Sequence, residues 1–245
     1  MSFKKLHIRY QTARSLPAPY AYFYTLALTP VANNAIQVDL AITYPDRDDI
    51  DDDELIAEGY TRDDDFTWAG QLPKPWLETI QNLVGKTRLQ PLNEDELDED
   101  DDFWDMTLEA DERKQGKPMK PDDWQYIIQE LIQATYEATG RERPFELTYL
   151  NFAGPQGAIE LRLTASFAKR SVNVVSIQNR SEQTKTLPWS ILQHVMSAVY
   201  NHDYDPDDAQ LKRPQRDGQW LNLGTEEWYD VSPFKDLTKT LKNLQ

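Results

Sequence analysis

The stretch Ala35-Ile36-Gln37-Val38-Asp39-Leu40-Ala41-Ile42-Thr43-Tyr44 alternates apolar and polar residues along its whole length. Residues 158–167 repeat the same alternation in the same order. Successive side chains of a strand point to opposite faces, so each stretch places its apolar residues on one face of a sheet. The pattern predicts antiparallel sheet that is covered on one face only.

Weaker patterns around these two stretches complete an α+β prediction. Alternating or β-branched runs predict further strands at 5–11, 20–28, 145–152 and 171–177. Apolar residues at helical spacing behind a proline predict helices at 73–84, at 121–139, from Pro188, and from Ser232 as N-cap. We expect antiparallel sheets with these amphipathic helices packed on one face.

Two turns are also predicted from their residue types. Gly154 to Gly157 should turn the 145–152 strand into the next one, and Asp217-Gly218 should form a hairpin between 209–213 and 219–223.

The two halves of the chain resemble each other. Both contain an alternating strand followed by a proline–tryptophan entry into a helix, Leu72-Pro73-Lys74-Pro75-Trp76 and Leu187-Pro188-Trp189. This predicts two related β-rich units, residues 1–90 and 121–245, with residues 91–120 as an acidic connecting segment. One continuous domain without internal symmetry is the alternative.

The net charge of −16 is concentrated in the middle of the chain. Residues 46–130 carry 27 acidic and 9 basic side chains, a net charge of −18, while the remainder carries 15 acidic and 17 basic ones. Such a region repels nucleic-acid phosphates and anionic lipids. We therefore expect no direct nucleic-acid or membrane binding, and a basic protein or a cation as partner.

The chain contains no cysteine, which excludes disulfides, thiolate metal sites and cysteine nucleophiles. Residues 1–7 include two lysines without an apolar run behind them, and no stretch reaches the roughly 20 apolar residues of a membrane span. These features predict a soluble, cytoplasmic protein and leave its oligomeric state open.

The chain carries acidic runs at 46–65 and 94–112. Counting from Asp49, Glu54 stands at the position where a calcium loop of the EF-hand type requires glycine, and counting from Asp203, Asp208 stands there. Neither stretch therefore fits such a loop. Solvated loops, or a contact surface for a basic partner, are the remaining interpretations. The second run encloses an apolar segment that would anchor such a partner, giving as candidate contacts Asp98, Asp100, Asp101, Asp102, Phe103, Trp104 and Met106.

A second group of residues offers an enzymatic alternative. Metal-ligating or acid–base side chains are densest directly after the predicted third helix, at His202, Asp203, Asp205, Asp207 and Asp208. No G-x-S-x-G nucleophile motif and no phosphate-binding loop accompany them. No catalytic, metal or cofactor residue is assigned, and His7 is interpreted as a strand residue facing away from the core.

Two further functions, neither of them enzymatic, are compatible with the sequence. Tyr20, Tyr22, Phe23 and Tyr24 would line a small-molecule cavity if the sheet were cupped. The leading hypothesis is a non-enzymatic interaction protein, such as an inhibitor or immunity-type protein. Its carboxylates would take the place of phosphates on a nucleic-acid-binding partner.

Overall fold

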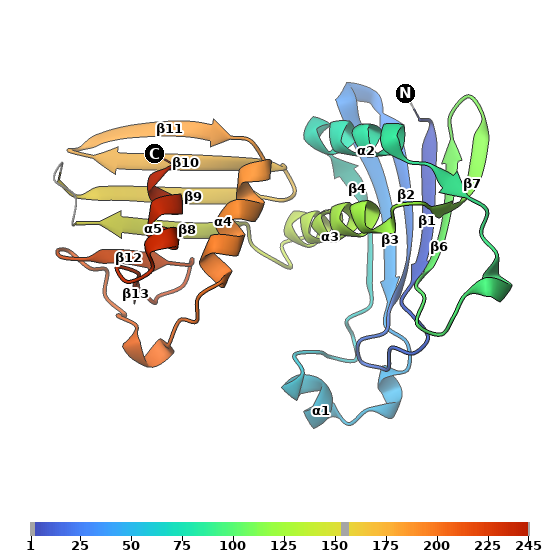
Figure 1. Cartoon of the computed structure of the whole chain (residues 1–245), viewed down its shortest axis with the longest axis horizontal. Coiled ribbons are helices and arrows are strands. Elements are labelled where there is room, and N and C mark those ends of the chain that lie inside the picture. Colours follow the sequence, from blue (N-terminus) through green and yellow to red (C-terminus); the bar gives the residue numbers. More distant parts are fainter. Residues whose placement is uncertain (1–2, 153–156, 245) are drawn as a thin grey trace. The chain divides into compact units, whose positions relative to one another are not determined.

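The computed structural model describes residues 3–152 and 157–244. The chain divides into two compact units, Met1–Ile132 and Gln133–Gln245, and each contains one antiparallel sheet (Figure 1). This division differs from the boundaries expected from the sequence. Part of the expected connecting segment, 91–120, belongs to the first sheet, because two of its stretches pair as strands there.

The first unit has a seven-stranded sheet in the order β4-β3-β2-β1-β6-β7-β5. Its strands are β1 Lys5–Gln11, β2 Phe23–Val31, β3 Ala35–Thr43, β4 Phe66–Leu72, β5 Leu89–Gln90, β6 Phe103–Glu109 and β7 Arg113–Pro118. Its helices are α1 Asp52–Ala57, α2 Lys74–Lys86 and α3 Pro121–Ala138, and the division between the units falls within α3.

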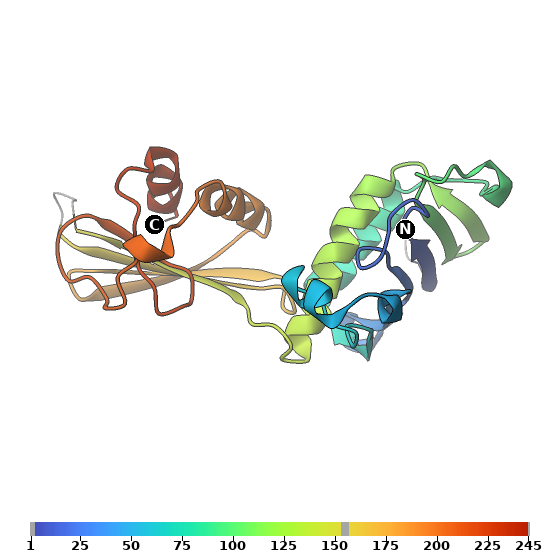
Figure 2. The same cartoon turned by 90° about the horizontal axis from the view of Figure 1, so that it is seen from below.

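The second unit has a six-stranded sheet in the order β11-β10-β9-β8-β12-β13. Its strands are β8 Phe145–Asn151, β9 Ile159–Ser166, β10 Ser171–Gln178, β11 Ser181–Leu187, β12 Gln219–Asn222 and β13 Tyr229–Asp230. Helices α4 Ser190–Tyr200 and α5 Lys235–Lys242 lie together on one face of this sheet (Figure 2).

The two units share one chain path. In each, four consecutive strands form a meander and a helix follows. A later strand then pairs with the first strand of the meander, β6 with β1 in the first unit and β12 with β8 in the second. In the first unit the short strand β5 comes before β6 and pairs with β7. Both proline–tryptophan segments stand at the same point of this path, between the fourth strand and its helix. The prediction of two related β-rich units in an α+β fold is therefore confirmed.

The one-sided covering of the first sheet follows from its register. Ile8 of β1 lies opposite Leu26 of β2 and Met106 of β6, and all three are buried. Helices α2 and α3 cover this face (Figure 1) with an apolar stripe of Trp76, Leu77, Ile80, Val84, Trp124, Ile128 and Leu131. The opposite face carries the intervening side chains, among them His7, as predicted.

Two local predictions are wrong, and a third lies partly outside the described residues. Strand β12 pairs with β8 and β13, so the hairpin predicted at Asp217-Gly218 is wrong, and residues 209–213 contribute one bridge, Gln210 to Trp228. Helix α5 begins at Lys235, because the Ser232 hydroxyl accepts a hydrogen bond from the Gln219 backbone instead of capping the helix. The turn predicted from Gly154 extends outside the described residues.

Candidate functional site

Three loops of the first unit meet at one end of its sheet. The pairing of Gln11 with Phe23 and Phe103, and of Phe23 with Thr43, places the ends of β1 and β3 beside the starts of β2 and β6. Ile42 pairs with Phe66, which starts β4 at the same end. Figure 1 shows α1 at this end. We call the group of loops 12–22, 44–65 and 91–102 the acidic end.

Most of the negative charge of the middle region lies here. Loop 44–65 carries 11 carboxylates and loop 91–102 carries 8, while the three loops together contain three basic residues, Arg14, Arg47 and Arg62. Nearly all of these carboxylates are exposed. Like charges gathered at one end produce a focused negative potential that an even distribution would not produce.

Arg47 holds two of these loops together. Its side chain is 2% exposed and donates to the Pro19 carbonyl from Nε at 3.3 Å and from Nη2 at 3.0 Å. Nη1 donates to the Thr61 carbonyl at 2.8 Å and pairs with Asp64. The guanidinium therefore satisfies acceptors on loops 12–22 and 44–65 at once.

Two tyrosine rings complete the environment of this guanidinium. Its carbon lies 4.1 Å from the ring centre of Tyr44 and 4.7 Å from that of Tyr60. Cation–π contacts are strongest when the cation is desolvated, as Arg47 is. The loop between β3 and β4 is ordered around a buried cation, although its outer surface is acidic.

Loop 91–102 is fixed to the first loop by separate contacts. Asp102 accepts hydrogen bonds from the Tyr10 hydroxyl at 2.8 Å and from the Ala13 backbone at 2.9 Å. The Ser15 backbone donates to the Glu99 carbonyl at 3.0 Å. Burial, followed by the charges of Tyr22 and Asp102, raises the pKa of Tyr10, so its hydroxyl keeps its proton and remains a donor.

The ion pair of Asp64 predicts how this loop responds to acid. Partial burial by itself raises the pKa of Asp64, but hydrogen bonds from Thr61 and the Arg47 guanidinium outweigh it and hold the pKa below its usual value. The lowered pKa of Asp64 contributes to the unfolding free energy. This contribution is fully present above the ordinary aspartate pKa of about 3.9, and it is lost as the pH falls through the pKa that Asp64 has in the folded protein.

We therefore expect the unfolding free energy of Asp64→Asn to vary less with pH than that of the wild type below pH of about 4. Urea unfolding at a series of pH values measures the difference, and a carboxyl-carbon NMR titration of Asp64 checks its cause. A titration midpoint at or above the ordinary aspartate value would contradict the assignment.

The candidate contact residues of the second acidic run have different environments. Asp98, Asp100 and Asp101 are exposed, whereas Asp102 is used in the loop contacts above. Phe103 is half-buried, with the Arg9 guanidinium 5.5 Å from its ring centre. Trp104 and Met106 are buried in the sheet core and cannot anchor a partner. Their alternation within β6 points both toward the helices.

Other apolar side chains are exposed at the acidic end. They are Leu16 and Tyr20 on loop 12–22, Phe23 at the start of β2, and Ile56 on α1, which is 66% exposed. Exposed apolar side chains surrounded by charged residues are typical of protein-binding surfaces. The acidic end thus combines negative charge with exposed apolar side chains, and these are not the Trp104 and Met106 of the prediction.

The His202 cluster forms an exposed turn in the second unit. The His202 ring stacks on Phe234 with 4.1 Å between ring centres, and Asp205 accepts from the Asp207 backbone at 2.9 Å. Asp203, Asp205, Asp207 and Asp208 are all exposed. Within residues 3–152 and 157–244, no three His, Asp or Glu side chains are grouped so as to hold a metal ion. The geometry gives no support to a metal or acid–base role here.

The aromatic strand considered for ligand binding packs into the core instead. The buried Tyr24 ring stacks on Tyr10 at 4.9 Å, and Trp104 packs edge-on against Tyr10 at 4.8 Å. Tyr20 and Phe23 are exposed. These rings fill the space that a ligand would need at this end of the sheet.

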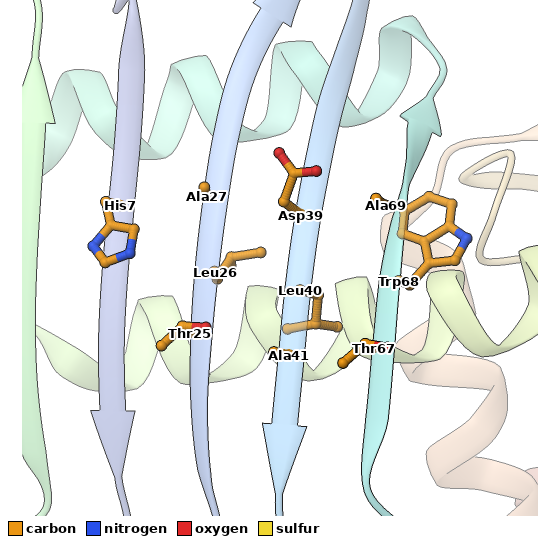
Figure 3. A pocket seen from close by; sticks show the side chains of 10 residues that line it. All are labelled: His7, Thr25, Leu26, Ala27, Asp39, Leu40, Ala41, Thr67, Trp68 and Ala69. Carbon is orange, nitrogen blue, oxygen red and sulfur yellow. The ribbon is translucent and has the colours of Figure 1, made fainter.

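A shallow hollow of about 350 Å³ lies on the uncovered face of the first sheet (Figure 3). Small side chains on β2, β3 and β4 leave this space open beside His7 and Asp39, namely Thr25, Ala27, Ala41, Thr67 and Ala69. Their side chains offer hydroxyls and methyl groups, and nothing in this face selects one kind of ligand.

Comparisons with protein-family models, with curated proteins and with solved structures each find no match to this chain. Among the residues that the structure describes, no helix is long and apolar enough to cross a lipid bilayer.

Sequence analysis missed Arg47, the residue that orders the acidic end. It was overlooked because the 46–65 run reads as irregular acidic chain. The sequence feature that could have indicated its burial is a single arginine between Tyr44 and Tyr60, in a run that contains only one other basic residue. An isolated cation among carboxylates and aromatic rings is a candidate for burial as an ion pair.

Proposed function

We propose that this chain is a non-enzymatic interaction protein that binds a basic protein through the acidic end of its first unit. The observation that carries the proposal is the register of the first sheet, which brings two acidic loops from distant parts of the sequence to the same place. Opposite charge steers such partners together and selects against acidic ones.

The preorganisation of the loops supports this function. Gathering carboxylates at one end costs stability through mutual repulsion, and a basic surface relieves that repulsion on binding. Because Arg47 and Asp102 hold the loops in place before any partner arrives, less conformational entropy is lost in the complex. Leu16, Tyr20 and Ile56 supply the apolar contact that charge alone lacks.

Among interaction proteins, the negative charge of the acidic end favours an inhibitor or immunity-type protein. A protein that binds nucleic acid presents a basic surface spaced for phosphates, and rows of carboxylates can occupy that surface. A cytoplasmic location is part of the proposal, and the absence of cysteine in the sequence supports it.

Neutralising exposed carboxylates of the acidic end should weaken partner binding roughly tenfold at low salt, since three rim charges contribute about 0.3–1 kcal/mol each. The variant is Asp98→Asn/Asp100→Asn/Asp101→Asn. The matched control, Glu109→Gln/Asp111→Asn/Glu112→Gln, removes the same charge at the opposite end of β6. Binding is measured calorimetrically with the purified protein recovered by low-salt affinity capture.

The result is decided by comparing the two variants. A basic partner that binds the control normally and the acidic-end variant weakly supports the proposal. If the captured protein is not basic, or if both variants bind it equally well, the acidic end is not the docking site. The binding loss should also shrink as salt is raised toward 0.15 M, where charges beyond about 8 Å are screened.

A further inference from the structure

The first unit contains a second charged feature, of the opposite sign. A hollow of about 410 Å³ lies between the end of α2, the β5–β7 edge and the start of α3. We call it the cationic hollow. Its lining includes three basic residues, Lys86, Arg88 and Lys120, and one acidic residue, Asp123.

The three cations are not neutralised by neighbouring carboxylates. Among the described residues, none of the three forms an ion pair within 4.0 Å, whereas Arg47, Arg62 and Arg213 each do. All three side chains are exposed at the rim of the hollow. A net positive lining in a chain of net charge −16 is a local reversal of the protein's field.

The walls of the hollow are tied to one another by hydrogen bonds. The Thr87 hydroxyl donates to the Leu83 carbonyl at 2.8 Å and accepts from the Trp124 indole at 2.9 Å, which joins α2 to α3. The Met119 backbone donates to the Arg88 carbonyl at 3.0 Å, and Leu89 of β5 pairs with Pro118 of β7. These hydrogen bonds fix the walls of the hollow relative to one another.

Apart from Thr87, the rest of the lining is apolar. Leu83, Pro118 and Trp124 form the floor, and Met119, which is 58% exposed, stands at the edge. An unbranched thioether adapts to ligands of different shape. The volume falls within the usual range of small-molecule sites, about 300–1,000 Å³, which combine an apolar wall with a few charged groups.

We propose that the cationic hollow binds a carboxylate joined to an apolar group. The apolar group packs on Leu83 and Met119, while the carboxylate accepts charge-assisted hydrogen bonds from Lys86, Arg88 and Lys120. Two sources offer this chemistry, a free aliphatic acid and the C-terminal carboxylate of a peptide that ends in an apolar residue. The proposal is independent of the acidic end.

The test compares acids with their uncharged amides by calorimetry on the full chain. The probes are octanoate and octanamide, and a pentapeptide ending in leucine with a free or an amidated C-terminus. We expect at least one acid to bind about tenfold or more tightly than its amide. Lys86→Gln/Arg88→Gln/Lys120→Gln should abolish that preference, because it removes the three positive charges.

A control variant separates the hollow from general charge. Lys5→Gln/Arg113→Gln/Lys114→Gln removes three other exposed cations and should bind the acid as the wild type does. Asp123→Asn removes the carboxylate in the lining and should tighten binding severalfold, an effect that a merely structural role of this residue does not predict. Circular dichroism and thermal unfolding confirm that each variant is folded.

Each outcome decides the proposal. Binding of octanoate assigns the site to free acids, and binding of the peptide acid alone assigns it to peptide C-termini. If neither acid binds, if the amides bind equally well, or if the control variant loses binding as fully as the triple variant, the proposal is overturned. Displacement of the acid by an equal concentration of inorganic phosphate would show that the apolar wall takes no part, and would overturn it as well.

Discussion

Arg47→Met is expected to lower the unfolding free energy of the first unit by about 3–5 kcal/mol, the usual loss when one partner of a buried ion pair is removed. The methionine keeps the volume but leaves the Pro19 and Thr61 carbonyls without their donor, and Asp64 without its cation. Loops 12–22 and 44–65 would then also lose the contact that holds them together. Urea unfolding measures the loss, and hydrogen exchange locates it in the first unit.

Two further substitutions test whether the hydrogen bonds of the Arg47 guanidinium, and not its charge alone, account for the expected loss of stability. Arg47→Lys keeps the positive charge but not the planar fork, so it should recover only part of the stability. Lys74→Met removes an exposed cation paired with Glu78 at 3.2 Å and should cost no more than about 0.5 kcal/mol. Equal losses for Arg47→Met and Lys74→Met would contradict the role assigned to Arg47.

Gly116→Ala is expected to be the most damaging glycine substitution in the first sheet. Gly116 of β7 has φ +152°, and a Cβ there would lie 2.1 Å from the backbone oxygen of Gln90 on β5. No side-chain movement relieves a clash with backbone, so β5 must separate from β7. A loss of roughly 2–4 kcal/mol is expected, measured by urea unfolding.

Gly85→Ala is the matched control, and it should raise the unfolding free energy where Gly116→Ala lowers it. Gly85 lies within α2 near its end, and a Cβ there would have no heavy atom within 4 Å. Alanine in this position should stabilise the first unit by about 0.5–1 kcal/mol, because it lowers the entropy of the unfolded chain and favours helix. A stable Gly116→Ala protein would contradict the backbone clash.

Regular elements could be predicted from sequence where periodicity was strong. The 35–44 stretch and the α3 stripe of Trp124, Ile128 and Leu131 satisfied simple spacing rules, and each formed the expected element. Strands β4, β7 and β11 were missed because glycine, lysine and threonine replace the apolar residues that mark a strand. Their strand conformation depends on pairing with neighbours already in the sheet.

The candidate site could be predicted from the sequence only in part. Charge composition identified the acidic region, and the exposed Asp98, Asp100 and Asp101 remain its candidate contacts. Trp104 and Met106 were misplaced because an apolar pair inside an acidic run does not reveal which neighbours its strand will have. β6 inserts between β1 and β7, and that pairing buries both.

The sequence by itself determined the α+β class, the doubled strand-and-helix unit and the amount of charge in the middle of the chain, because each depends on local order or composition. Only the tertiary structure decided that two acidic loops share one end, that Arg47 is buried where loops 12–22 and 44–65 meet, and that Lys86, Arg88 and Lys120 line one hollow. Those groupings depend on contacts between residues far apart in the chain, and such contacts are set by strand register and packing, which no single stretch contains.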